Sequence, residues 1–403
     1  MHILVLSDNF VPEQNAPALR TRDHCRRWVE DGHQVTVITT IPNFPTGEAQ
    51  YGYRNRWRQE ETIEGIRVVR VWSYLAPNKG TVRRALDFVS FAVSGFLAGR
   101  RESPDVIVAT SPQLLTALAG HWLSQALAVP WIFEVRDMWP DSVLAVDAMN
   151  DGAAIRALLR LEDFLYRSAS RIVTISDALR ELIAQKGVDR NKIGVVYNGI
   201  DPHRLIPREK SPRLLQHFGY EGKFVIGYVG THGLAQKLET VVNAAKMLES
   251  HDDIRFLFVG DGARREALID MAAKLALSSI EFHGLVTSTT VVEYLALCDA
   301  IVVPLKNTAL FEGALPTKIF EAAAMERPII LSAAGIAADL VRKYDAGLAI
   351  APEDATALAA SIIELRNDSA LRQRFAAGGR GLAADFDRNK LADLMLDEIR
   401  RVL

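Results

Sequence analysis

Short apolar segments rich in β-branched residues recur along most of this chain, and helix-length segments separate most of them. The first half contains ILVLS, QVTVITT, IRVVRVW, VIVAT, WIFEV, RIVTIS and KIGVVY, and the second half contains FVIGYVG, IRFLFVG, IEFHG, AIVVP, PIILS and GLAIA. Apolar strands joined by helical crossovers form parallel sheets that are covered on both faces. The pattern therefore predicts an α/β fold built on parallel sheets.

One stretch interrupts this alternation. Residues 198–223 are rich in proline and charge, which is typical of a linker. The alternation restarts after it, so we expect two α/β domains, residues 1–200 and 201–385, that face each other across a cleft. We expect residues 386–403 to form a final amphipathic helix, which can pack on either half, including back onto the N-terminal domain.

Composition limits the function classes for these 403 residues. A net charge of −2 gives no reason to expect a nucleic-acid partner. The two cysteines, Cys25 and Cys298, lack metal-like spacing and indicate a reducing compartment. The N-terminus lacks the features of a signal peptide, and no apolar run reaches the ~18–20 residues needed to span a bilayer. We therefore expect a cytoplasmic protein.

Two loops that follow strands of the first half are candidate sites, because parallel sheets bind ligands at the carboxyl ends of their strands. The loop Ser7–Arg20 lacks the glycine pattern that dinucleotides require, so it either lines the cleft or simply begins a helix. The loop 134–142, EVRDMWPDS, is dense in charge. Its Asp137 can accept a hydrogen bond from a substrate hydroxyl, and its Arg136 can hold a phosphate or carboxylate. The alternative is an Arg–Asp pair that only fixes the turn.

In the second half, residues 227–239, GYVGTHGLAQKLE, predict a strand, a glycine-rich loop and a helix start. Free backbone N–H groups at a helix start, with Lys237 expected in the first turns of that helix, form an anion site. The Walker A spacing is absent, and a simple tight turn is the alternative. Two weaker candidates, 259–266 and 283–286, also follow strands and favour the same nucleotide-phosphate role.

Glu321 is the most informative single residue, because it interrupts the apolar helix start KIFEAAAM. An ionised carboxylate in apolar surroundings costs several kcal/mol unless it is paired. A capping box does not explain it, since Lys318 occupies the position three residues earlier. We interpret Glu321 as accepting hydrogen bonds from a polyhydroxyl ligand, with Lys318 and the backbone after Pro316 near the phosphates of that ligand. A solvated helix glutamate is the alternative.

Together these motifs resemble the GT-B glycosyltransferases of family 4, a large retaining group that uses nucleotide sugars. The resemblance rests on DGHQVTVIT at 31–39, VYNGID at 196–201, FVGDG at 258–262 and LPTKIFEAAAMERPII at 315–330. The segments IPNFPTG, EVRDMWPDS and LPTKIFEAAA are similar to a bacterial subgroup assigned to the transfer of amino-deoxyhexoses, such as fucosamine, in surface polysaccharide assembly. The resemblance implies the GT-B fold, two Rossmann-like domains, and no metal or other cofactor.

The resemblance also implies roles for particular residues. The donor would be a nucleotide sugar, most often linked to UDP, and the acceptor a glycan or a lipid-linked sugar. The expected catalytic residues are Asp137, Arg136, Lys237 and Lys318. The expected donor-binding residues are Gly230, Thr231, His232, Gly233, Lys237, Gly260, Asp261, Gly262, His283, Gly284, Leu285, Val286, Leu315, Pro316, Thr317, Lys318 and Glu321. The expected acceptor-binding residues are Glu13, Asn15, Ala16, Asn43, Arg136 and Trp139.

The sequence departs from the family pattern at three places. The family has two acids separated by seven residues, whereas Gly313 stands at the first position here and Glu312 is one residue off. The usual arginine of the phosphate loop is replaced by Thr231 and His232. The family's histidine near the reacting sugar aligns with Arg136, so Asp137 is expected to substitute for that contact.

Residues 79–101 have basic ends around an apolar middle that only Asp87 interrupts. This composition suits either a helix lying on an anionic bilayer surface or a buried crossover helix. A lipid-linked acceptor would favour the first, with peripheral membrane association. Two other functions remain open at this point: a two-lobe sugar-binding protein, and another GT-B enzyme such as a nucleotide-sugar epimerase or a phosphorylase.

Overall fold

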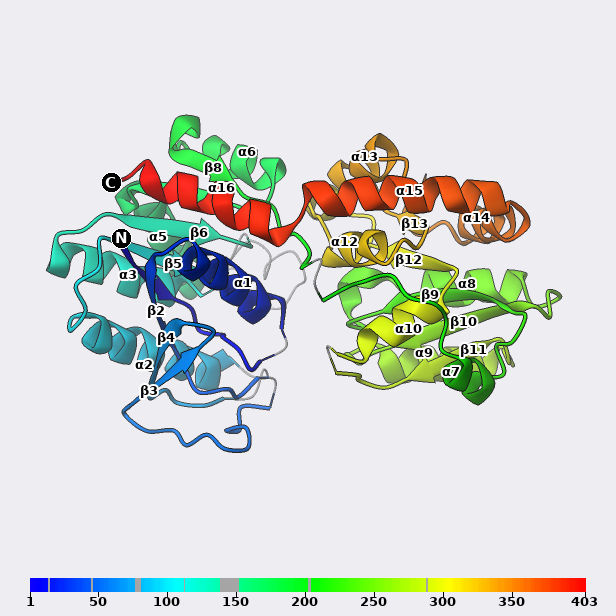
Figure 1. Cartoon of the computed structure of the whole chain (residues 1–403), viewed down its shortest axis with the longest axis horizontal. Helices are drawn as coiled ribbons and strands as arrows, with labels where there is room; N and C mark the ends of the chain where they lie inside the picture. Colours follow the sequence, from blue (N-terminus) through cyan, green and yellow to red (C-terminus); the bar gives the residue numbers. More distant parts are fainter. Residues whose placement is uncertain are drawn as a thin grey trace. The chain divides into compact units, whose positions relative to one another are not determined.

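The computed structural model describes residues 1–13, 15–44, 46–76, 81–111, 113–137, 152–201, 204–287 and 289–403. Its contacts divide the chain into two units, each an α/β layer structure (Figure 1). Unit 1 comprises Met1–Asn198 with Arg388–Leu403, and unit 2 comprises Gly199–Asp387.

The described part of unit 1 contains an eight-stranded sheet. In sheet order its strands are β3 (Arg58–Ile63), β4 (Ile66–Val71), β2 (Gln34–Thr39), β1 (His2–Leu6), β5 (Val106–Thr110), β6 (Trp131–Val135), β7 (Arg171–Thr174) and β8 (Ile193–Val195). Every strand predicted in this half is present, and all neighbours pair in parallel except β3 with β4.

The antiparallel strand β3 was missed by the sequence analysis, and the expectation of parallel strands needs this correction. Its sequence RQEETI is largely polar because β3 lies at the sheet edge, where charged side chains are common. Glu64 and Gly65 connect β3 to β4, and both have positive φ angles of 50° and 79°. Two residues with left-handed backbone form the tight hairpin turn that matches the twist of the two strands.

Helices cover both faces of this sheet. They are α1 (Ala16–Glu30), α2 (Thr81–Gly99), α3 (Leu114–Leu127), α5 (Ala153–Ser168), α6 (Asp177–Gln185), the short 3₁₀ helix η1 (Arg190–Lys192) and α16 (Arg388–Arg400). Buried side chains of α2, α3 and α5 form one core with the sheet, and those of α1 and α16 form another. The predicted terminal helix is therefore present, and it belongs to unit 1.

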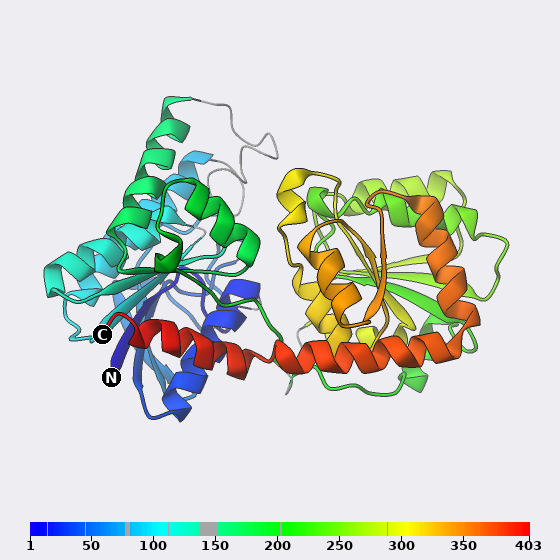
Figure 2. The same cartoon turned by 90° about the horizontal axis from the view of Figure 1, so that it is seen from above.

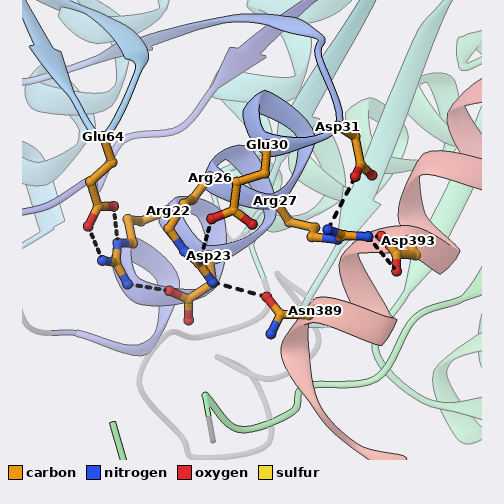
Figure 3. Close-up of polar contacts among 9 residues, drawn as sticks. All are labelled: Arg22, Asp23, Arg26, Arg27, Glu30, Asp31, Glu64, Asn389 and Asp393. Carbon is orange, nitrogen blue, oxygen red and sulfur yellow. Dashed lines mark hydrogen bonds and ion pairs between the residues drawn. The ribbon is translucent and has the colours of Figure 1, made fainter. Parts of the chain in front are cut away.

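Apolar and polar contacts both hold α16 against α1, beside which it lies in Figures 1 and 2. The indole N–H of Trp28 donates to the carbonyl of Ala392 over 2.9 Å. Figure 3 shows the charged rim of this seam, where Arg27 pairs with Asp393 at 2.8 Å and Arg26 donates to Asn389 at 3.0 Å. The last helix of the chain thus completes the core of the first domain.

Unit 2 contains a six-stranded parallel sheet in its described residues. In sheet order its strands are β11 (Ile280–His283), β10 (Ile254–Val259), β9 (Phe224–Val229), β12 (Ala300–Pro304), β13 (Ile329–Ser332) and β14 (Gly347–Ile350). All six were predicted from their apolar segments.

The helices of unit 2 flank this sheet in Figure 2. They are α7 (Pro212–Phe218), the 3₁₀ helix η2 (Leu234–Gln236), α8 (Glu239–Met247), α9 (Arg265–Lys274), α10 (Val291–Leu297), α11 (Ala309–Glu312), α12 (Thr317–Ala324), α13 (Ile336–Lys343), α14 (Ala355–Asn367) and α15 (Ser369–Asp385).

Candidate active site

The strand order of each sheet locates its ligand edge. Crossovers run in opposite directions on either side of β9 and β12 in unit 2, and of β1 and β5 in unit 1. Open parallel sheets bind ligands outside the carboxyl ends of the strands at this switch point. The loops that follow these four strands are therefore the places to look for a site.

Close contacts between two glycine loops define the backbone of the unit 2 site. Gly230 follows β9, while Gly260 and Gly262 follow β10, and all three have positive φ angles. A Cβ atom on Gly260 would lie 2.1 Å from the carbonyl oxygen of Gly230, and one on Gly262 would lie 2.5 Å from that of His232. Gly260 and Gly262 therefore cannot be replaced without strain, because their backbone is in a conformation that favours glycine and because another backbone segment approaches them closely.

Lys318, in the first turn of α12, lies directly against the loop that follows β9. A Cβ atom on Gly230 would come within 2.5 Å of the Lys318 side chain, whose Nζ lies 5.3 Å from the centre of the Tyr228 ring. Burial lowers the pKa of Lys318, which the nearby charge of Glu321 opposes. Among the described residues, the Lys318 amino group has no carboxylate within ion-pairing distance.

Glu321 lies one turn further along α12, so it shares a helix face with Lys318. It is half-buried, whereas its neighbours Ala322 and Ala323 are fully buried. In the part of the chain that the structure describes, its carboxylate takes part in no hydrogen bond or ion pair. A capping role is also absent, because the helix begins after Pro316 without any side-chain cap. The structure thus brings Gly230, Lys318 and Glu321 together and leaves both charges available to a ligand.

The ring of His232 does not face solvent, although the residue stands in the glycine loop. It is 0% exposed and packs 5.6 Å from Tyr228 and 6.0 Å from Phe258 between ring centres. Burial lowers the pKa of His232 to about 4, so the ring is neutral. Its backbone N–H donates to Asp261 over 2.8 Å, which ties the two glycine loops together. Both ring nitrogens are buried without a hydrogen-bond partner among the described residues, and the contact of His232 with a donor stays a prediction.

Lys237 lies in a different local structure from the predicted one. It precedes α8 and ends the 3₁₀ helix η2 with a positive φ of 44°, whereas the sequence analysis placed it inside the helix. Its Nζ lies 3.8 Å from the carboxylate of Glu353, which follows β14. Glu353 also accepts a hydrogen bond from the backbone of Asn307 at 2.9 Å. Sequence reasoning missed Glu353, although its place directly after a strand was a usable signal.

The remaining predicted donor residues lie in loops at the same edge of this sheet. The ring of His283 is engaged, since it hydrogen-bonds Tyr294 over 2.8 Å and stacks on it. Leu285 is largely exposed. The others are partly or fully accessible loop or helix-start positions: Thr231, Gly233, Asp261, Gly284, Val286, Leu315, Pro316 and Thr317.

Glu312, the acid one residue off the family spacing, ends α11 and is exposed. A Cβ atom on Gly335 would lie 2.0 Å from its carbonyl oxygen. The backbone of α11 therefore packs against the loop after β13, and the Glu312 side chain is exposed.

In unit 1, Arg136 follows β6, which spans the predicted segment WIFEV and includes Glu134. Its backbone N–H donates to Ser111 over 2.7 Å. The Nε and Nη1 atoms of Arg136 are buried and have no hydrogen-bond partner. Burial lowers the pKa of Arg136 to about 10, although Glu134 opposes this. Since Glu134 is already paired with Arg20 at 3.0 Å, Arg136 has unused donors for an anion.

The predicted acceptor residues in the first loops are engaged in local structure. The Asn15 side chain caps α1 by accepting from Ala18 over 2.9 Å, and Ala16 begins that helix. The buried carboxylate of Glu13 accepts the backbone N–H groups of Asn43 and Phe44, each over 2.9 Å. Glu13 therefore fixes the loop after β2, a structural role that the sequence did not suggest.

Two further predicted residues belong to the loop after β6. Asp137 is exposed and follows Arg136 directly. Trp139 lies outside the described residues.

The helix α2, predicted from residues 79–101, has one buried and one exposed apolar face, and its contact with a bilayer stays a prediction. Its inner face is buried and includes Phe91 and Asp87. Its outer face carries a continuous apolar stripe whose members are 41% to 74% exposed: Val82, Leu86, Val89, Val93 and Leu97. Arginines at positions 83, 84, 100 and 101 flank this outer stripe, and exposed Trp122 of α3 packs edge-on against Phe96 of α2 at 6.0 Å. Among the described residues, no helix has both the length and the apolarity to cross a membrane.

Comparisons with known proteins agree with this architecture. Residues 15–199 match the glycosyl transferase 4-like domain, and residues 215–381 match the glycosyl transferases group 1 family. WbjE of Pseudomonas aeruginosa, assigned as a glycosyltransferase, is 26% identical over 69% of this chain and 70% of its own length. WcaI of Escherichia coli K12, assigned to colanic acid biosynthesis, is 26% identical over 79% of this chain and 80% of its own.

Among solved structures, HepE of Anabaena in complex with UDP superposes with a TM-score of 0.72 at 17% identity, covering all of both chains. This likeness confirms the predicted GT-B fold. With the two domain matches, it defines the class of the protein: the chain is a glycosyltransferase of the GT-B type, whose relatives act in bacterial polysaccharide synthesis. The matches therefore favour glycosyl transfer over a sugar-binding protein or an epimerase.

Proposed function

We propose that this protein transfers a sugar from a nucleotide diphosphate donor, bound at the switch point of unit 2, to an acceptor in bacterial surface polysaccharide synthesis. The observation that carries the proposal is the pair Lys318 and Glu321 beside the glycine loop at Gly230. These two charged groups share one face of α12, and neither forms an ion pair with another described residue. A cation beside free backbone N–H groups suits a diphosphate, and a carboxylate suits ribose hydroxyls.

UDP is the nucleotide we propose, because HepE, whose fold this chain shares, was crystallised with UDP. The acceptor hydroxyl attacks C1 of the donor sugar on the face that the diphosphate leaves. The bond from C1 to the diphosphate oxygen breaks, and the departing diphosphate takes the hydroxyl proton. Lys318 and Lys237 stabilise the negative charge that develops on this leaving group. This path retains the configuration at C1 and uses residues of the chain without a metal.

Arg136 and Asp137 are proposed to act from unit 1. Two guanidinium nitrogens of Arg136 are buried and have no hydrogen-bond partner among the described residues, so they suit an anionic group on the acceptor. Exposed Asp137 can accept a hydrogen bond from a sugar hydroxyl. We propose an N-acetylated amino-deoxyhexose as the transferred sugar, which rests on the resemblance of the LPTKIFEAAA and EVRDMWPDS segments.

The reaction is tested by offering the protein UDP-sugars and GDP-sugars with a lipid extract of a bacterial envelope and measuring the nucleotide released. We expect UDP release that depends on the extract. Release of GDP alone would keep the transferase and change the donor. Conversion of the donor without any acceptor would indicate an epimerase or hydrolase, and no turnover of any donor would contradict the proposal.

A lipid-linked acceptor would place the protein at a membrane surface, and we propose that the outer stripe of α2 lies in that surface. Five aliphatic side chains with arginines at both ends provide the apolar area and the positive charge that an anionic bilayer attracts. Replacing Leu86, Val89 and Val93 together by serine is expected to weaken binding to phosphatidylglycerol vesicles by about 10-fold or more.

Vesicle co-sedimentation measures this effect. The matched control replaces three exposed aliphatic residues from other surfaces, Leu182, Met247 and Leu394, by serine, and we expect it to bind as the wild type does. Equal binding of both triple variants would show that α2 is not the membrane contact.

A further inference from the structure

A carboxyl group and a carboxamide meet at the switch point of unit 1, and a second carboxyl group acts on this pair electrostatically. Asp8 follows β1, and Gln113 follows β5, the strand on the other side of the switch point. The Gln113 carboxamide donates to the Asp8 carboxyl group. Asp87 joins them from the inner face of α2 and affects Asp8 electrostatically. Three segments far apart in the sequence therefore converge where parallel sheets bind their ligands.

Several acidic groups influence one another around Asp8. Burial and the negative charges of Asp87 and Glu13 hold the pKa of Asp8 well above its ordinary value. Burial likewise raises the pKa of Asp87 to about 7, which Arg84 and the Ser73 hydroxyl oppose. Arg84 is the cation that acts on both acids, and Glu13 is already engaged by the backbone of Asn43 and Phe44. The fold keeps two buried acids with raised pKa values here although burying them costs stability.

Gln113 supplies an independent sign of a missing partner. It is 6% exposed, and its side-chain oxygen is buried with no hydrogen-bond partner among the residues that the structure describes. It stands at the N-cap of α3, yet its side chain makes no capping bond and is directed at Asp8 instead. A buried carbonyl oxygen left unpaired costs about 1–3 kcal/mol. What is missing is therefore a hydrogen-bond donor.

The polar groups around Asp8 and Gln113 indicate which kind of hydrogen-bond donor can bind there. Carboxyl and carboxamide oxygens can accept several hydrogen bonds. Among the described residues, the side chains that donate to the Asp8 carboxyl group are those of Asn9 and Gln113. Asp8 is half-buried, so a ligand can reach it from the ligand edge of the sheet. The described residues hold no cluster of His, Cys, Asp or Glu suited to a metal ion. Sugar hydroxyls, which donate and accept at once, match this set of oxygens.

We propose that Asp8, Asp87 and Gln113 form a subsite that binds a hydroxyl group of the acceptor sugar. The inference rests on the proposed function and deepens it, because it assigns the acceptor's sugar to the switch point of unit 1. The three residues are positioning and specificity residues, which hold the acceptor without entering the transfer of the glycosyl group.

The test measures binding of simple methyl glycosides to the full chain by saturation-transfer NMR with UDP present. The probes are methyl glycosides of glucose, galactose, mannose, rhamnose, N-acetylglucosamine and glucosamine. We expect at least one neutral glycoside to bind the wild type, and both Asp8→Asn and Gln113→Leu to weaken it by about 10-fold or more. Gln125→Leu, an exposed position on the same helix, is the matched control and should bind as the wild type does.

Three results would overturn the inference: no binding of any glycoside, unchanged binding by both subsite variants, or a clear preference for the cationic glucosamine. A titration of the same samples with UDP distinguishes a failure of the acceptor subsite from a failure of the proposed function. If UDP binds and the glycosides do not, only the subsite is wrong. Thermal unfolding checks the variants, because removing an unpaired buried oxygen in Gln113→Leu should not lower the melting temperature by more than a few degrees.

Discussion

Replacement of Lys318 by alanine is expected to lower kcat/KM for glycosyl transfer by about 10²–10³-fold, the usual effect of removing a group that stabilises charge developing in the transition state. The variant should keep its stability. The Lys318 amino group is buried beside Gly230 without a carboxylate partner, so its removal relieves a desolvation cost that no described ion pair offsets. Loss of activity together with an unchanged or higher melting temperature is therefore the expected combination.

A matched lysine is available for comparison. Lys343 also holds its amino group over a tyrosine ring, 5.4 Å from the centre of Tyr344, but it lies at the end of α13. Lys343→Ala should leave the rate unchanged. Equal losses in Lys318→Ala and Lys343→Ala, or full activity of Lys318→Ala, would remove Lys318 from the mechanism.

The pH dependence gives a second readout for Lys318. Because burial lowers its pKa, Lys318 loses its proton at a lower pH than an exposed lysine does. Binding of UDP should weaken as the pH rises through this lowered value, since the neutral amine no longer attracts the diphosphate. In Lys318→Met this dependence on alkaline pH should disappear, which calorimetric titrations at several pH values measure.

The largest expected loss of stability follows from Leu396→Asp in α16. Leu396 is 1% exposed and belongs to the core that α16 forms with α1 and the sheet of unit 1. The change removes about 2 kcal/mol of apolar burial and places a carboxylate in an apolar core at a further cost of several kcal/mol. For a unit of this size we expect the melting temperature of unit 1 to fall by about 10 °C or more.

Leu394→Asp, two residues away on the same helix, is the control because Leu394 is 50% exposed. It should shift the melting temperature by no more than about 2 °C. Differential scanning calorimetry measures both variants. A small effect of Leu396→Asp, or equal effects of the two, would mean that α16 does not complete the core of the first domain.

The apolar segments of the sequence were sufficient to predict all strands of the described residues except β3, whereas the helix α7 (Pro212–Phe218) lies inside the stretch interpreted as a linker. The parallel strands are buried on both faces, so each appears as an uninterrupted apolar segment, and the linker at 198–223 separated the two sets. The edge strand β3 was not predicted because its side chains are polar on both faces. The start of α8 was misplaced because Lys237 adopts a left-handed conformation that its residue type does not indicate.

The site was predictable only where its residues follow strands. That rule identified the loop at Gly230. Glu321 was found by a different signal, the presence of a charge in an otherwise apolar helix segment. The rule could not indicate that Lys318 packs against Gly230, or that the His232 ring is buried, since both depend on contacts between distant segments. Asp8 and Gln113 went unnoticed for the same reason: each is an ordinary polar residue until the fold places them together.

The central claim is that a nucleoside diphosphate binds against Lys318 and Glu321 in unit 2. Calorimetric titration of the wild type, Lys318→Ala and Glu321→Gln with UDP and with pyrophosphate tests it most directly. The account predicts that the wild type binds both and that Lys318→Ala weakens both by about 10-fold or more. It also predicts that Glu321→Gln weakens only UDP, because Glu321 is proposed to contact the ribose, which pyrophosphate lacks. If UDP bound all three proteins equally, or did not bind the wild type, the donor site proposed here would be wrong.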